Sequence, residues 1–129
     1  YWVDVVAKRI FRLNPSDGRV DIRDLPFAPS AILPKREGGL LLITKKGIAL
    51  LEAFDGAMES VPVPQIDFTR EVFNDAACDR AGRLWVGTRD INAAQPKGRL
   101  YRIDADFGIT LHAEGLVISN GIAWSPDGR

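Results

Sequence analysis

The chain has 129 residues, of which 46% are hydrophobic and 26% charged, a composition typical of a globular protein. Its 17 basic and 17 acidic residues give a formal net charge of zero, which offers no basic surface for nucleic acid. No apolar run approaches the roughly 20 residues that a membrane-spanning helix needs. We therefore expect neither nucleic acid nor a membrane as a partner. The single cysteine, Cys78, cannot form an internal disulfide, which favours a reducing, cytoplasmic location.

The first 25 residues predict three short strands. Residues 1–6 and 9–13 are rich in aromatic and β-branched side chains, and residues 20–25 alternate apolar with polar side chains. Between the second and third of these strands, residues 14–18 contain Pro15 and Gly18 and predict a turn.

A second group of strands follows. Residues 31–34, 40–44 and 48–54 are apolar and are separated by short turns. Residues 60–66 predict a further strand that contains Pro62 and Pro64. Because proline donates no backbone hydrogen bond, we expect this strand at the outer edge of its sheet.

A third group is predicted at residues 74–79, 84–88, 98–104 and 109–113, with a loop at 89–97. Cys78 falls in the first of these strands and is predicted to be an inert core thiol. Residues 117–119 are expected to open a fourth group.

An internal repeat links the third and fourth groups. Residues 74–83 align without a gap with residues 120–129, which places Asn74 on Asn120 at an offset of 120 − 74 = 46 residues. The match also places Gly82 on Gly128 and Arg83 on Arg129, and both Gly-Arg pairs are predicted hairpin turns. Such a repeat indicates one supersecondary unit that is used several times.

Four short strands per roughly 40–50 residues, without helical periodicity, predict an all-β fold built from β-propeller blades. A β-sandwich or a solenoid is the alternative, but a sandwich does not predict the gapless match. Residues 1–129 then form a partial β-propeller domain with an incomplete first blade, two further blades and the start of a fourth. Propellers usually close with about 4–8 blades. We therefore expect part of a longer protein, or a chain that self-associates through exposed blade faces.

Asn74 and Asn120 occupy equivalent places near the start of the innermost strand of successive blades, so their side chains are expected to point toward one axial pocket. Amide oxygens from separate strands suit a hard cation such as Ca²⁺ or Mg²⁺. The alternative is purely structural, because Asn followed by Gly is a common turn pair.

Taken together, the motifs resemble the family of senescence-marker protein (regucalcin), gluconolactonase and luciferin-regenerating enzyme. The matching text is Tyr-Trp-Val-Asp at 1–4, Phe-Asn-Asp at 73–75, Gly-Arg-Leu-Trp-Val-Gly-Thr at 82–88, Gly-Arg-Leu-Tyr at 98–101 and Ser-Asn-Gly at 119–121. The resemblance implies a six-bladed propeller, of which this chain covers roughly the N-terminal half. It also implies hydrolysis of lactones, often sugar lactones, with one axial divalent metal.

The resemblance assigns roles to residues of this chain. Asn120 corresponds to a metal ligand, and Asn74 to a residue that contacts substrate and helps line the metal site. Asp90 or Asn92, in the loop after Gly-Thr, corresponds to an acidic substrate-binding position. Ca²⁺ is the expected metal, with Zn²⁺, Mg²⁺ or Mn²⁺ as alternatives. The metal would polarise the lactone carbonyl and activate water, with a carboxylate as general base.

The family's carboxylate ligands fall outside residues 1–129, so no catalytic residue is assigned to this chain and the isolated chain is expected to be inactive. Val72 stands where the family often has an arginine that clamps the substrate, and Ala76 stands where glycine is usual. Two other functions therefore remain open. One is a non-catalytic propeller that serves as a binding or assembly scaffold. The other is a related propeller hydrolase with another substrate, such as an alkaloid-synthase-like or arylesterase-like enzyme.

Overall fold

The computed structural model describes residues 1–128, and this part of the chain is all-β. It divides into two compact units, Tyr1–Pro62 and Val63–Arg129. All strand pairs within the described residues are antiparallel. Residues 1–128 include no helix of the length and apolar character that crossing a membrane requires.

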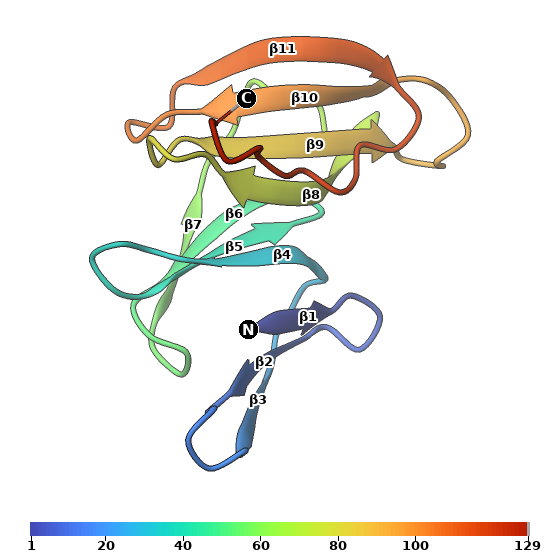
Figure 1. Cartoon of the computed structure of the whole chain (residues 1–129). Coiled ribbons are helices and arrows are strands. Elements are labelled where there is room, and N and C mark those ends of the chain that lie inside the picture. Colours follow the sequence, from blue (N-terminus) through green and yellow to red (C-terminus); the bar gives the residue numbers. More distant parts are fainter. Residues whose placement is uncertain (129) are drawn as a thin grey trace. The chain divides into compact units, whose positions relative to one another are not determined.

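The first unit holds two sheets (Figure 1). One has the strand order β1-β2-β3 and the other the order β4-β5-β6-β7, so every strand pairs with its neighbour in sequence. The strands are β1 (Trp2–Asp4), β2 (Arg9–Leu13), β3 (Val20–Asp24), β4 (Pro29–Pro34), β5 (Leu40–Thr44), β6 (Gly47–Leu51) and β7 (Met58–Val61).

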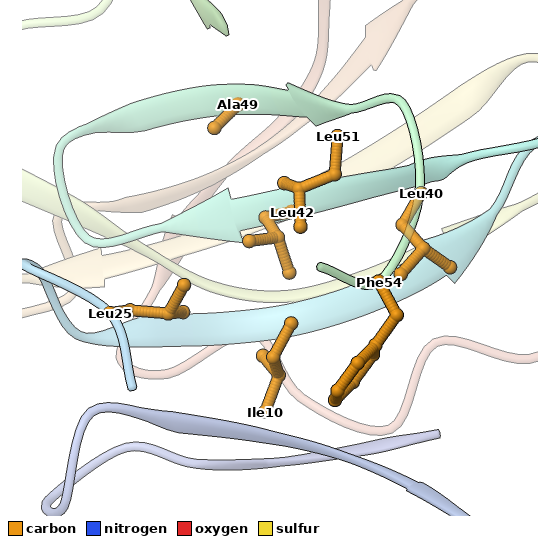
Figure 2. Close-up of a cluster of buried hydrophobic side chains, with 7 residues drawn as sticks. All are labelled: Ile10, Leu25, Leu40, Leu42, Ala49, Leu51 and Phe54. Carbon is orange, nitrogen blue, oxygen red and sulfur yellow. The ribbon is translucent and has the colours of Figure 1, made fainter. Parts of the chain in front are cut away.

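Side chains from both sheets of the first unit form one hydrophobic core. Figure 2 shows Ile10 from β2 close to leucines of β5 and β6 and to the ring of Phe54. The alternation of side chains along a strand explains this pattern, since Leu40 and Leu42 of β5 point to the same face. The complete cluster consists of Ile10, Leu25, Leu40, Leu42, Ala49, Leu51 and Phe54.

The second unit holds one sheet with the order β11-β10-β9-β8 (Figure 1). Its strands are β8 (Glu71–Cys78), β9 (Leu84–Asp90), β10 (Gly98–Ile103) and β11 (Ile109–Leu116). The segment after β11, red in Figure 1, runs back alongside β9 and β8. It is attached there by a hydrogen bond from the Ser119 amide to the Thr88 carbonyl (3.2 Å) and by an edge-on contact of Trp124 with Trp85.

The predicted all-β class and sequential strand groups are confirmed. The repeat is also visible in the backbone, because Gly82 and Gly128 both adopt a left-handed conformation, with φ of 80° and 79°. Each glycine amide donates a hydrogen bond to the carbonyl three residues earlier, in Asp79 and Ser125 respectively. The last residue of the repeat, Arg129, lies outside the described residues.

The strands predicted at 1–6 and 48–54 end earlier than expected, at Asp4 and Leu51, and three further details of the sequence prediction are wrong. The strand predicted at 60–66 is β7, which spans Met58–Val61 and stops where Pro62 can donate no hydrogen bond, although its edge position is confirmed. Residues 117–119 form no strand and contribute one isolated bridge, between Ile118 and Arg89. Cys78 lies exposed at the end of β8 and is not a core thiol.

Candidate functional site

Asn74 lies at an irregularity of β8. In the pairing with β9, Phe73 is opposite Thr88 and Asp75 is opposite Gly87, so Asn74 is the extra residue of a β-bulge. A bulged residue is left out of the ladder and its side chain is redirected, which is why bulges are frequent beside active sites. β8 is also an edge strand of its sheet, so one side of the bulge has no strand beside it within the described chain.

The bulge brings Asn74 to Asn120. The Asn74 Nδ2 donates a hydrogen bond of 2.9 Å to the Ser119 carbonyl and makes a longer contact of 3.4 Å with the Asn120 Oδ1. Asn120 is exposed and Asn74 half-buried. The structure therefore places the two amides side by side.

Asn120 belongs to a short irregular segment, residues 119–122, which we call the amide segment. Its approach to the sheet requires a glycine at position 87, because a Cβ added there would lie 2.0 Å from the Ser119 Oγ. Gly121 has a φ of 70°, a conformation that glycine adopts without strain. Gly87, in the Gly-Arg-Leu-Trp-Val-Gly-Thr motif, and Gly121, in the Ser-Asn-Gly motif, thus allow the amide segment to lie against β8 and β9.

Asp90 is the last residue of β9, and Asn92 lies in the loop that follows. Neither side chain hydrogen-bonds to Asn74 or Asn120. Asp90 is 3% exposed, and its Oδ2 accepts the backbone amides of Asn92 and Ala94. The hydrogen bond from the Ala94 amide lowers the pKa of Asp90 most, and the bond from the Asn92 amide lowers it further. The carboxylate of Asp90 therefore organises the loop, while the Asn92 side chain is exposed.

Glu71 is a buried carboxylate that sequence reasoning missed. It is 1% exposed and accepts hydrogen bonds from Thr88 Oγ1 (2.6 Å), Arg99 Nη1 (2.8 Å) and the Tyr101 hydroxyl (2.9 Å). Burial, followed by the bond to Glu71, raises the pKa of Tyr101 to about 12. Because all its partners belong to the sheet, this network stabilises the start of β8, three residues before Asn74.

Arg89 is a second missed residue. It pairs directly with Val72 across β8 and β9, and its backbone also bridges to Ile118. Its Nη1 donates to the carbonyls of Asp90 and Ile91, at 2.8 and 3.0 Å. Val72 itself is 6% exposed, so its side chain lies in the interior. A guanidinium is thus present on the strand next to Val72, although Val72 is apolar.

The third missed residue is Asp75, whose Oδ2 accepts the backbone amide of Ile122 at 3.0 Å. The sequence does contain a signal for it, since Asp75 directly follows Asn74 in the Asn-Asp pair. Glu71 and Arg89 have no such signal, because their partners become neighbours only through strand register.

The amide oxygens of the Asn pair are of a kind that divalent cations bind. Within residues 1–128, no group of three or more His, Cys, Asp and Glu side chains could hold a metal ion. The Asn74 Oδ1 accepts no hydrogen bond from the described residues, and the Asn120 Oδ1 accepts only the 3.4 Å contact. Two uncharged oxygens of a type that hard cations prefer are therefore available.

Sequential antiparallel sheets and a polar pair beside an edge-strand bulge characterise this all-β chain. The whole chain, residues 1–129, matches the family described as SMP-30/gluconolactonase/LRE-like region. The chain belongs to this family, which confirms the resemblance seen in the sequence.

Two relatives illustrate the family. The chain is 35% identical to a 6-deoxy-6-sulfogluconolactonase of Pseudomonas putida, over 98% of this chain and 44% of the relative. It is 31% identical to the pentonolactonase XacC of Haloferax volcanii, over 98% of this chain and 42% of the relative. The chain thus spans about half the length of the curated relatives it matches.

Two solved structures agree with the fold. A luciferin-regenerating enzyme superimposes with a TM-score of 0.86 at 28% identity, over 98% of this chain and 45% of the other. A regucalcin from Agrobacterium tumefaciens, described as a calcium-binding protein, gives a TM-score of 0.84 at 25% identity, over 98% of this chain and 43% of the other.

Proposed function

We propose that the protein containing this chain is a divalent-metal-dependent hydrolase that opens lactones, in particular sugar lactones. The observation that carries the proposal is the meeting of Asn74 and Asn120, 46 residues apart, at the bulge of β8. Membership of the family and the lactonase names of relatives support the reaction class. We also propose that the sheets of this chain are blades of a six-bladed propeller in the whole protein.

The metal that best fits the two amide oxygens is Ca²⁺, and Zn²⁺, Mg²⁺ and Mn²⁺ are the alternatives to be tested. A neighbour described as calcium-binding supports this choice. Affinity for a hard cation rises with the number and charge of its oxygen ligands, so two neutral amides alone bind weakly. Carboxylates from parts of the protein outside this chain are therefore expected to complete the site.

When bound, the metal supplies polarisation of the lactone carbonyl and a lowered pKa of water. The role of Asn120 is to hold the cation through Oδ1, and that of Asn74 is to line the site and contact substrate. Asn92, exposed at the start of its loop, is positioned to hydrogen-bond substrate hydroxyls. Asp90 contributes by holding the backbone of that loop, because its carboxylate is occupied by two amides. The general base is expected outside this chain.

Arg89 is the proposed replacement for the arginine that the family often has at the position of Val72. The two residues are direct cross-strand partners, whose Cβ atoms lie roughly 5 Å apart in such pairs. One nitrogen of Arg89 is used by loop carbonyls, and the described residues leave its other donors unused. A guanidinium at this place would contact polar or anionic groups of the substrate.

One observation favours the second candidate, a non-catalytic binding scaffold. Val72 is buried and cannot contact a ligand, so the substrate clamp is absent from its usual position. A related propeller hydrolase with another substrate remains the third reading. The scaffold predicts no metal binding, whereas both hydrolase readings permit it.

Calorimetric titration of the full-length protein with Ca²⁺, Zn²⁺, Mg²⁺ and Mn²⁺ separates these candidates. We expect one cation per protein, and binding at least about tenfold weaker in Asn120→Ala because an oxygen ligand is lost. Asn14→Ala is the control, since Asn14 caps a turn of the first unit by accepting the Ser16 amide. A folded wild-type protein that binds none of the four ions would favour the scaffold.

A further inference from the structure

Asn120 lies in a segment without strand hydrogen bonding, so something else must hold its side chain in place. On its N-terminal side, the Ser119 amide donates to the Thr88 carbonyl and the Ser119 carbonyl accepts from Asn74. On its C-terminal side, the nearest hydrogen bond is the one from the Ile122 amide to Asp75. Asn120 therefore lies between an N-terminal anchor made by Thr88 of β9 and Asn74, and a C-terminal anchor made by Asp75.

Asp75 is well suited to this task. Its Oδ1 accepts the amide of Ala76 at 2.8 Å, which fixes the carboxylate on the bulge, and its Oδ2 reaches the Ile122 amide at 3.0 Å. Hydrogen bonds from an amide to an ionised carboxylate are shorter and stronger than those to a neutral oxygen. Asp75 is half-buried, which reduces the competition from water for these bonds.

We propose that Asp75 is the positioning residue of Asn120: its carboxylate holds the C-terminal side of the amide segment so that the Asn120 oxygen faces the site. The inference rests on the proposed function for its consequence, the binding of a cation by Asn120. Its structural part, the anchoring of the segment by Asp75, can be measured without any metal.

Four variants of the full-length protein test the proposal. Asp75→Ala removes both acceptor oxygens, and Asp75→Asn keeps one of them. Asp106→Ala is the matched control, because Asp106 also accepts a backbone amide, from Gly108 at 2.9 Å, but in a turn between β10 and β11. The fourth variant combines Asp75→Ala with Asn120→Ala.

Hydrogen exchange of the metal-free protein is read by mass spectrometry in peptides that cover residues 117–128. We expect exchange in these peptides to be at least about tenfold faster in Asp75→Ala, intermediate in Asp75→Asn and unchanged in Asp106→Ala. Unchanged exchange in folded Asp75→Ala would overturn the proposal. If Asp75→Ala does not fold, the same comparison is made with Asp75→Asn.

Calorimetry then tests the consequence for the cation. Loss of a residue that orients a ligand typically weakens metal binding by about 10–100-fold, and we expect this for Asp75→Ala. In the Asn120→Ala background, Asp75→Ala should have no further effect, since both act through one oxygen. An equal further weakening would contradict positioning. A wild-type protein that binds no cation would refute the proposed function, and the exchange experiment would still decide the anchoring.

Discussion

At the scale of single residues, carboxylates that accept backbone amides shape the second unit. Asp79 accepts the amides of Ala81 and Arg83, the Arg83 guanidinium at 2.6 Å and the Trp85 indole at 3.0 Å. Burial alone would raise the pKa of Asp79, but the bonds from Trp85 and Arg83 outweigh it and lower the pKa to about 2. The ionised form is thus favoured in the folded hairpin.

Asp79→Asn should therefore destabilise the protein in a pH-dependent way. Because the folded pKa is depressed below its ordinary value of 3.8, the carboxylate stabilises the fold above that value. The contribution is about 2 kcal/mol at neutral pH and disappears as the pH falls toward 2.

Urea unfolding of the full-length protein between pH 7 and pH 3 measures this difference. We expect the gap between wild type and Asp79→Asn to narrow below about pH 4. Asp106→Asn, in an exposed turn, should cost less at neutral pH. A gap that stays constant over the whole range would contradict the account.

At the scale of elements, the close approach of the amide segment to β9 depends on Gly87. A Cβ at this position would lie 2.0 Å from the Ser119 Oγ and 2.4 Å from its Cβ, and neither atom is the end of a long side chain. The strand and the segment would have to separate.

Gly87→Ala should cost roughly 1–3 kcal/mol of stability, as overpacking typically does. It should also weaken cation binding in the full-length protein, because the segment carries Asn120. Thermal unfolding and calorimetry measure the two effects.

Ser119→Gly provides the rescue, because the nearest remaining atom, the Ser119 backbone carbon, lies at an ordinary 3.6 Å. The cost of Gly87→Ala should therefore be smaller in the Ser119→Gly background. An equal cost in both backgrounds would show that the close approach is not the cause.

At the scale of the whole molecule, the first sheet presents an apolar row. Trp2 is paired with Phe11 and Phe11 with Ile22 across β1, β2 and β3, and the rings of Trp2 and Phe11 stack at 5.0 Å. Trp2 and Ile22 are 44% and 56% exposed. Aligned exposed apolar side chains of this kind favour association.

We expect the isolated chain to self-associate through this row. Sedimentation velocity should show oligomers that shift toward monomer in Ile22→Lys. Val6→Lys is the control, because Val6 is 93% exposed but lies in the turn between β1 and β2. A wild-type chain that stays monomeric at high concentration would contradict the expectation.

Much of the strand order of both units could be predicted from the sequence. The strand pattern predicts the sequential sheets, and the 46-residue repeat singles out Asn74 and Asn120, which lie in contact in the structure. The only local signal for Asp75 is its place after Asn74, and Glu71 and Arg89 have no local signal at all. Their roles arise from hydrogen bonds and cross-strand pairs between segments far apart in sequence, and these depend on a bulge and a register that local patterns do not specify.

The central claim is metal-dependent lactone hydrolysis with Asn120 as a ligand, and the direct measurement is turnover by the full-length protein. Hydrolysis of gluconolactone is followed by pH-stat with EDTA, after Ca²⁺ is restored, and in Asn120→Ala beside Asn14→Ala. We predict turnover that EDTA abolishes and Ca²⁺ restores, and that is lost in Asn120→Ala but kept in Asn14→Ala. Turnover that persists in EDTA, or that Asn120→Ala leaves unchanged, would contradict the account.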